Sequence, residues 1–316
     1  MALIDRTGAS ALIPEEASQT IIQSVATSSA VLKLAKKMPN MNRAQLRMPM
    51  MGTFPTAYFV DGDTGLKTTT SMSWENVYIN AEKLAVIVPL PDTVFDDADY
   101  DIWGQINPRI SEAIGVAIDR AILHGTNAPA AWPDDLMTQI TAASHTVDED
   151  TAAYPDLFDA LLGRGTGDED SVFALVEQDG FRVNGSVAQP VMESKLRGLR
   201  SADGVPIFMQ DMRSDTDFRL AGRPINFVDN GAMASTVRLI AGDWSQLVWS
   251  MRTDITYTMS KDATIQNAGG GIEYNLFQQD MTALRAVIRL GWALPNPPNK
   301  VNETDATRFP FAALLA

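Results

Sequence analysis

The stretch Lys83-Leu84-Ala85-Val86-Ile87-Val88-Pro89-Leu90 is an almost unbroken apolar run, and the rest of the sequence is organised around it. A run of this length and composition predicts a β-strand that is buried on both faces. Beyond the acid-rich segment 92–101, isoleucine recurs at every fourth position, which predicts a long helix from about residue 100 to 124 with one apolar stripe. Pro108 either kinks this helix or stands at its first position, and Gly125 ends it. The isoleucines of the stripe are Ile102, Ile106, Ile110, Ile114, Ile118 and Ile122.

Two segments with few strong apolar positions precede this strand. Residues 1–45 are predicted to form an extended arm with one helix, which starts at Ile13-Pro14-Glu15-Glu16 because proline and acids favour a first helical turn. Residues 46–82 alternate between apolar and polar side chains around the turn cluster 61–65, which predicts a long two-stranded hairpin with solvated faces. Because an isolated hairpin is marginally stable in water, both segments are expected to lie against another surface, in the same chain or in a neighbouring copy.

The remaining sequence is predicted to combine α and β elements. Residues 126–150 have the composition of a loop. Residues 151–240 are mixed, with helices expected at 153–162 and 187–199 and a strand at 171–176. The C-terminal part is mostly β and includes a long strand at 281–294. At ~150 residues per domain, a chain of 316 residues fits about two domains.

Composition excludes several classes of protein. The formal net charge of −14 argues against a protein that grips nucleic acid by neutralising phosphates, which requires clustered lysine and arginine. The absence of cysteine excludes disulfide scaffolds, thiolate metal sites and cysteine nucleophiles. No uncharged apolar run reaches the ~18 residues of a transmembrane helix, and the N-terminus has no apolar signal core, so neither membrane insertion nor secretion is expected.

No motif predicts a catalytic, cofactor or metal site. The acids Asp97, Asp99 and Asp101 have the spacing that starts a calcium loop, but the glycine and glutamate positions of that loop are Ile102 and Pro108. The glycine-rich stretch 163–167 lacks the lysine of a phosphate loop. There are two histidines and no Gly-x-Ser-x-Gly elbow, which leaves a two-domain α/β hydrolytic enzyme only as a remote alternative.

The order of these elements resembles the Hong Kong 97 capsid fold, which is shared by the major capsid proteins of tailed bacteriophages and by encapsulin shells. Single motifs are weak, but their order and spacing are fairly specific and span nearly the whole chain. The stretches that carry the resemblance are Ala11-Leu12-Ile13-Pro14-Glu15-Glu16, Thr56-Ala57-Tyr58-Phe59-Val60-Asp61-Gly62, residues 83–90, Ile118-Asp119-Arg120-Ala121-Ile122-Leu123-His124-Gly125, Ala241-Gly242-Asp243-Trp244 and Asp280-Met281-Thr282-Ala283-Leu284-Arg285.

The resemblance implies an α+β fold with four parts. Residues 1–45 are the N-terminal arm and residues 46–82 the extended loop, a β-hairpin. The peripheral domain combines 83–140, which contains the spine helix at about 100–124, with 241–316. The axial α/β domain is 141–240.

The resemblance also implies a function. The expected protein is a non-enzymatic major capsid protein that self-assembles into the hexamers and pentamers of an icosahedral or prolate shell around phage double-stranded DNA, without sequence-specific binding. It would be assembled in the bacterial cytoplasm, remain in the virion and need no cofactor or membrane. Expected partners are a portal, either a separate scaffold protein or no scaffold (since the arm begins within the first dozen residues), and in some cases a decoration protein. The alternative is an encapsulin-type compartment shell, which the long N-terminal arm disfavours.

The expected contacts between subunits come from the arm and the hairpin. The candidate anchors are Ile13, Ile21 and Leu32 in the arm and Tyr58, Phe59, Lys67, Trp74 and Tyr78 in the hairpin. Some members of the family join a loop lysine to an asparagine with the help of a glutamate. Lys67 and Asn275 lie near the corresponding places, but the glutamate position falls on Ala283. Without that carboxylate the amide bond has no proton acceptor, so no covalent cross-link is expected.

Overall fold

The computed structural model describes residues 29–60, 67, 69–97, 102–149, 156–163, 170–199, 219–267 and 269–316. The helices are α1 (Ala30–Leu34), α2 (Asp92–Asp97), α3 (Ile102–His124), α4 (Leu136–Ala142), α5 (Leu157–Leu162), α6 (Val172–Gln178) and α7 (Pro190–Gly198). The strands are β1 (Lys36–Lys37), β2 (Gln45–Thr53), β3 (Ser73–Asn80), β4 (Glu82–Pro91), β5 (Thr146–Asp148), β6 (Gly185–Ala188), β7 (Arg219–Leu220), β8 (Arg223–Phe227), β9 (Val237–Gly242), β10 (Val248–Ser260), β11 (Thr264–Gln266), β12 (Ile272–Asn275), β13 (Met281–Ala293) and β14 (Phe311–Leu315).

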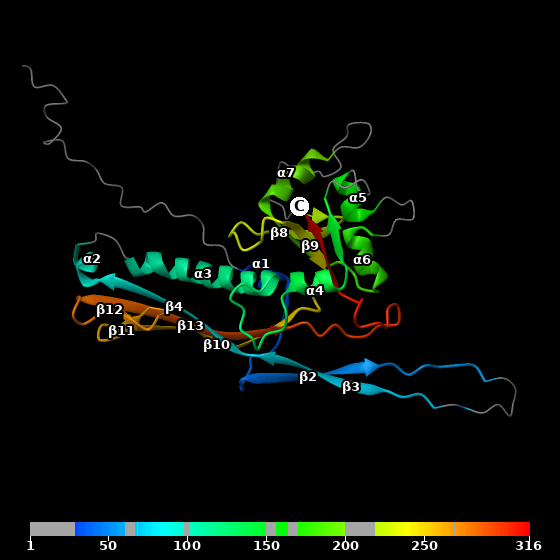
Figure 1. Cartoon of the computed structure of the whole chain (residues 1–316), viewed down its shortest axis with the longest axis horizontal. Coiled ribbons are helices and arrows are strands. Elements are labelled where there is room, and N and C mark those ends of the chain that lie inside the picture. Colours follow the sequence, from blue (N-terminus) through cyan, green and yellow to red (C-terminus); the bar gives the residue numbers. More distant parts are fainter. Residues whose placement is uncertain are drawn as a thin grey trace, which may run out of the picture.

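A four-stranded sheet in the order β1-β10-β13-β4 carries the long helix α3 on one face (Figure 1). Strand β13 pairs antiparallel with both β10 and β4 over most of its length. The predicted isoleucine stripe is confirmed: Ile110, Ile114, Ile118 and Ile122 are buried in one core with the apolar residues of β13. Pro108 lies inside α3, since the helix begins at Ile102.

The prediction that β4 is buried on both faces is wrong for the single chain. Its side chains alternate: Leu84, Val86 and Val88 pack against the core under α3, whereas Ile87 is 47% exposed. The physical reason is that α3 covers only one face of the sheet, and a strand with one covered face buries every second side chain. The opposite face presents Ile87 to the solvent.

The second large sheet is mixed and has six strands in the order β5-β14-β9-β6-β8-β7. Alternate residues of its central strands serve two different cores. Ile240 and Ala313 belong to the core that contains α3, whereas Leu239 and Leu314 pack with α5, α6 and α7. This sheet is therefore buried on both faces, and its inner face joins the two halves of the molecule.

The C-terminal strand departs from the expected division of the chain. The expected peripheral domain includes all of residues 241–316, but β14 pairs with β5 and β9 in the six-stranded sheet. Its sequence, Phe311-Ala312-Ala313-Leu314-Leu315, is apolar at every position, and a strand of that kind needs cover on both faces. The four-stranded sheet offers cover on one face only, so the C-terminal strand inserts into the other sheet.

Three local predictions also differ from the structure. Residues 126–150 contain α4 and β5, and α4 begins where the Asp135 carboxylate accepts a hydrogen bond from the Thr138 backbone N–H at 3.0 Å. Residues 171–176 belong to helix α6, because the Ser171 hydroxyl caps the Ala174 N–H. The helix expected at 187–199 begins only at Pro190, and Val187 lies in β6. In the described part of the chain, no helix is long and apolar enough to cross a membrane.

Candidate functional site

The hairpin of β2 and β3 is a separate two-stranded sheet that projects from the body of the molecule (Figure 1). Its antiparallel register runs from Gln45 opposite Asn80 to Thr53 opposite Ser73. Only its root has a core, in which Ile79 is fully buried. Beyond the root the hairpin contributes surface and little core, as the alternation in residues 46–82 predicted.

The structure places the predicted contact residues in three different settings. Phe59 is fully exposed, and Tyr58 and Lys67 are also exposed. Trp74 and Tyr78, on β3, are 65% and 44% exposed. Leu32 instead packs against the core of its own chain, on helix α1. Ile13 and Ile21 lie outside the described residues.

The root of the hairpin is held rigidly to the body. The Asn80 side-chain amide donates to the Ala131 carbonyl at 2.7 Å, and the Trp132 indole N–H donates to the Asn80 carbonyl at 3.1 Å. Gly291 of β13 lies so close to Asn80 that a Cβ at this glycine would stand 2.1 Å from the Asn80 carbonyl oxygen. Only glycine permits this approach, so the strand-to-hairpin junction depends on it.

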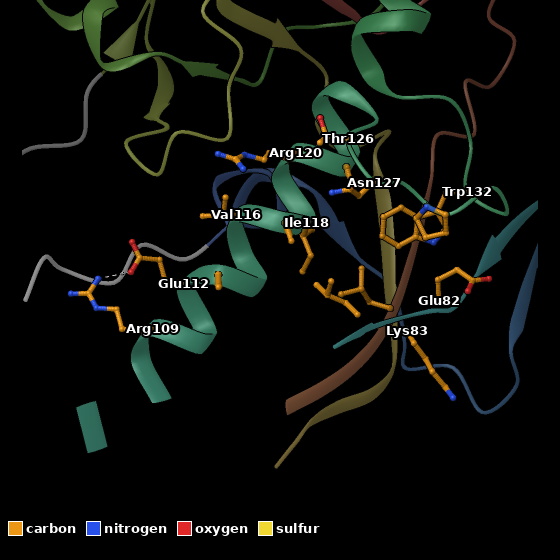
Figure 2. A pocket seen from close by; sticks show the side chains of 16 residues that line it. Glu82, Lys83, Arg109, Glu112, Val116, Ile118, Arg120, Thr126, Asn127 and Trp132 are labelled. Carbon is orange, nitrogen blue, oxygen red and sulfur yellow. Dashed lines mark hydrogen bonds and ion pairs between the residues drawn. The ribbon is translucent and has the colours of Figure 1, made fainter. Parts of the chain in front are cut away.

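A groove of about 570 Å³ runs along the exposed flank of α3, between this helix, β4 and the loop that carries Trp132 (Figure 2). Its walls include the apolar side chains of Leu84, Val116 and Trp132. Charged side chains stand at its ends, among them Arg109 and Glu112, which form an ion pair at 2.6 Å. The groove is therefore apolar along its walls and charged at its rim.

Asp119 is a buried carboxylate that ties three segments together. Its Oδ1 accepts hydrogen bonds from the Ser29 hydroxyl and the Val31 N–H, and its Oδ2 accepts from the Ala30 N–H at 3.0 Å and the Asn230 amide at 3.3 Å. Burial raises the pKa of this carboxyl, although the hydrogen bonds oppose the shift. Asp119 is not among the residues that the sequence singles out. The signal for it is an acid beside the buried stripe of a helix, where a carboxylate requires hydrogen-bond partners.

Both histidines make structural contacts. The Nε2 of His124 accepts the Ala234 backbone N–H at 2.9 Å, and burial lowers the pKa of His124. His145 is buried between the Phe311 carbonyl, 3.1 Å from its Nδ1, and the Asp179 carboxylate, 3.3 Å from its Nε2. These contacts join α3 and the six-stranded sheet to their neighbouring loops. Within the described residues, no group of three or more His, Asp or Glu side chains has the arrangement of a metal site.

The residues that a cross-link would join lie on different elements. Lys67 is in the hairpin, whereas Asn275 ends β12 and Ala283 is buried in β13. The Asn275 side-chain amide donates to the Gln278 side chain at 2.9 Å. Nearby, Asp92 accepts hydrogen bonds from Thr282 and, at 3.0 Å, from Lys261, and these contacts lower its pKa.

Comparison with known proteins identifies the family. The model of the phage capsid family matches residues 9–298. The chain is 25% identical over 285 residues to the probable major capsid protein gp17 of Mycobacterium phage D29, covering 87% of this chain and 83% of the relative. It is also 25% identical over 282 residues to the major capsid protein of Staphylococcus phage 80alpha, covering 87% of this chain and 79% of the relative.

Solved structures agree over the whole chain. A chain from Microbacterium phage Oxtober96 superposes with a TM-score of 0.82 at 32% identity and covers 99% of both chains. A chain from Mycobacterium phage Cain gives a TM-score of 0.81 at 25% identity, with 99% of this chain and 98% of that chain covered. The fold is thus the Hong Kong 97 capsid fold that the order of elements predicted. The chain belongs to the phage capsid family.

Proposed function

We propose that this structural capsid protein assembles into hexamers and pentamers that close into a shell around phage double-stranded DNA, and that the β2–β3 hairpin clasps an adjacent copy. The observation that carries the hairpin's role is its exposure: Phe59, Trp74 and Tyr78 stand on an element that has a core only at its root. Aromatic side chains are the residues that most often anchor protein interfaces.

Repetition of one such contact suits the closure of a shell. A hairpin on one copy and its seat on the next form a head-to-tail interface, which generates rings when the rotation closes. A standard interface buries about 1,600 Å² in total, and at ~25 cal/mol per Å² this offsets the cost of association. We propose that the arm residues Ile13 and Ile21 add to this contact, and that Leu32 fixes the root of the arm by packing in its own chain.

We propose four parts for the chain. Residues 1–45 form the arm and residues 46–82 the extended loop. The peripheral domain comprises 83–140 and the chain from 241 to the end of β13, with α3 as its spine helix. The axial domain is 141–240, completed by β14, which pairs with β5 and β9. This division differs from the sequence-based one in the place of β14.

The net charge of −14 favours a shell that encloses DNA without gripping it, because binding by phosphate neutralisation requires clustered cations. The corresponding proposals are residence in the virion after assembly in the host cytoplasm, no enzymatic activity, a portal and a separate scaffold protein as partners, and a possible decoration protein. The relatives named above are phage capsid proteins, which does not favour an encapsulin-type shell or an α/β hydrolase.

We propose that subunits are not joined covalently. A lysine-to-asparagine amide bond requires a carboxylate to take up the lysine proton, and Ala283 stands at the place where the family's glutamate is expected. Mass spectrometry of purified shells should find only single chains after denaturation. Peptides that join Lys67 of one chain to Asn275 of another would refute this.

The hairpin's role is tested by removing its outer part. The register pairs Thr53 with Ser73, so residues 54–72 can be replaced by Asn-Gly, a two-residue turn that closes an antiparallel hairpin. The variant should remain folded by circular dichroism but fail to form shells in electron microscopy and sedimentation. A milder variant, Phe59→Ala, should weaken assembly more than Val191→Ala, a change at an exposed apolar residue of α7. Normal shells from the turn variant would overturn the proposal.

A further inference from the structure

The chain between β13 and β14, residues 294–310, is a long loop without helix or strand, and we call it the C-terminal loop. Loops of this length in a compact fold are usually functional. This one is held by a dense set of hydrogen bonds. Arg308, 3% exposed, donates to the Asn302 carbonyl at 3.2 Å and to the Asn296 carbonyl at 3.1 Å. Hydrogen bonds from Arg308 therefore hold separate parts of the loop together.

The same loop is fastened to helix α6 through Asp179. The Asp179 carboxylate accepts from the Asn302 side chain at 2.8 Å and from the Phe309 N–H at 2.6 Å, and its carbonyl accepts from the Asn299 side chain at 2.6 Å. Gly180 (φ +76°) brings the end of α6 against Val301, where a Cβ would stand 2.9 Å from a Val301 methyl group. The loop thus extends the rigid body that contains the six-stranded sheet.

The exposed side of the C-terminal loop meets the hairpin. The Lys300 Nζ lies over the Phe54 ring, 5.4 Å from its centroid, and Glu303 pairs with the same ammonium at 3.2 Å. A hollow of about 460 Å³ is lined jointly by hairpin residues on both sides of the turn and by Pro298, Lys300 and Glu303. Figure 1 shows the hairpin passing the loop that precedes β14. Phe54 directly follows β2, so this contact lies beyond the hydrogen-bonded ladder of the hairpin.

We propose that Lys300 is a positioning residue and that the C-terminal loop is a buttress that sets the direction in which the hairpin leaves the body. The root fixes where the hairpin begins, through Asn80, but a two-stranded ribbon bends and twists along its length. A second contact near the outer end of the ladder removes that freedom. The hairpin's direction is thereby coupled to the six-stranded sheet through Lys300, Asn302 and Asp179. Its consequence for assembly rests on the function proposed above for the hairpin.

The coupling is tested by measuring the hairpin's direction within one subunit. Because the chain contains no cysteine, Ala57→Cys on the hairpin and Ser194→Cys on α7 supply two specific sites for spin labels. Full-length labelled chain, diluted with unlabelled chain, yields intramolecular distances by pulsed electron paramagnetic resonance. The wild-type background should give one narrow distance distribution. Lys300→Met should broaden it, with a two- to five-fold drop in the ratio of docked to undocked hairpin, the effect of an exposed cation–π contact at about 0.5–1 kcal/mol.

Two further variants make the test specific to the cation and the ring. Lys300→Arg should restore the narrow distribution, because arginine also lies over aromatic rings, and Phe54→Leu should reproduce the effect of Lys300→Met. Lys261→Met should leave the distribution unchanged, because Lys261 is an exposed lysine outside the C-terminal loop that pairs with Asp92. An unaltered distribution in Lys300→Met, or no rescue by Lys300→Arg, overturns the inference. Because the readout is a distance within one chain, this failure is distinct from a failure of the hairpin to support assembly.

Discussion

Substitution of Asp119 by asparagine tests how the start of the described chain is fastened to α3. The two Asp119 oxygens accept four hydrogen bonds, and all four come from uncharged groups. An asparagine that keeps its oxygen toward Ser29 and Val31 turns its NH₂ group toward the Ala30 N–H and the Asn230 amide. Two hydrogen bonds are lost, and donors face donors.

The magnitude follows from these two contacts. A hydrogen bond to a charged group contributes about 1.5–3 kcal/mol, while removal of a buried charge relieves part of its desolvation. We expect Asp119→Asn to lower the free energy of unfolding by about 2–4 kcal/mol, measured by urea denaturation of unassembled subunits with tryptophan fluorescence. Asp229→Asn, an exposed change in the loop that carries Asn230, is the control and should stay within about 0.5 kcal/mol of wild type.

The difference in the free energy of unfolding between wild type and Asp119→Asn should depend on pH. Burial raises the pKa of Asp119 in the folded state above its ordinary value, so the folded chain binds the proton more tightly than the unfolded chain. The contribution of this carboxyl to stability is then greatest at low pH and declines as pH rises through the folded pKa. The gap between wild type and Asp119→Asn should narrow as pH rises above about 4, the ordinary pKa of an aspartate. A gap that widens would show that the hydrogen bonds outweigh burial, and a gap below about 0.5 kcal/mol would refute the anchoring role.

Two further predictions concern α3. Ile122→Ala should lower the free energy of unfolding by about 2–5 kcal/mol, since Ile122 is fully buried on the face of α3 that packs in the core. Ile87→Ala, on the exposed face of β4, should lower it clearly less in the same urea titration, and equal losses would contradict the assignment of the two faces. His124 accepts the Ala234 N–H through Nε2, and burial holds its folded pKa below the ordinary histidine value of about 6.5. Its stabilising effect is therefore present above about pH 6.5 and is lost as pH falls through the folded pKa. His124→Gln keeps a hydrogen-bond acceptor that does not titrate, so its free energy of unfolding should rise relative to that of wild type as pH falls from 7.5 to 5.5. If the free energies of unfolding of the two proteins change in parallel with pH, this role for His124 is excluded.

The candidate site was partly predictable from sequence. Alternation and the turn cluster predicted the hairpin, and the structure places Phe59 and Trp74 on its exposed surface. The same reasoning grouped Leu32 with the contact residues, although it packs in its own chain, because an apolar residue on a short helix does not reveal which surface covers it. Nothing local marks Lys300, whose place over Phe54 depends on the course of a loop that is distant in sequence.

Sequence by itself determined the elements whose signal repeats over many residues. The isoleucine stripe of α3, the long strand β13 and the presence of the hairpin all follow from the periodicity of side chains along a helix or a strand, which is a local property of the backbone. Short apolar runs lack that redundancy, and so 171–176 was predicted as a strand although Ser171 caps a helix there. Only the tertiary structure decided which faces are covered. Burial of β4 on one side, the insertion of β14 into the six-stranded sheet and the partners of Asp119 all depend on contacts between residues far apart in the chain. Those contacts are set by the layers that must share a core, and no window of neighbouring residues contains that information.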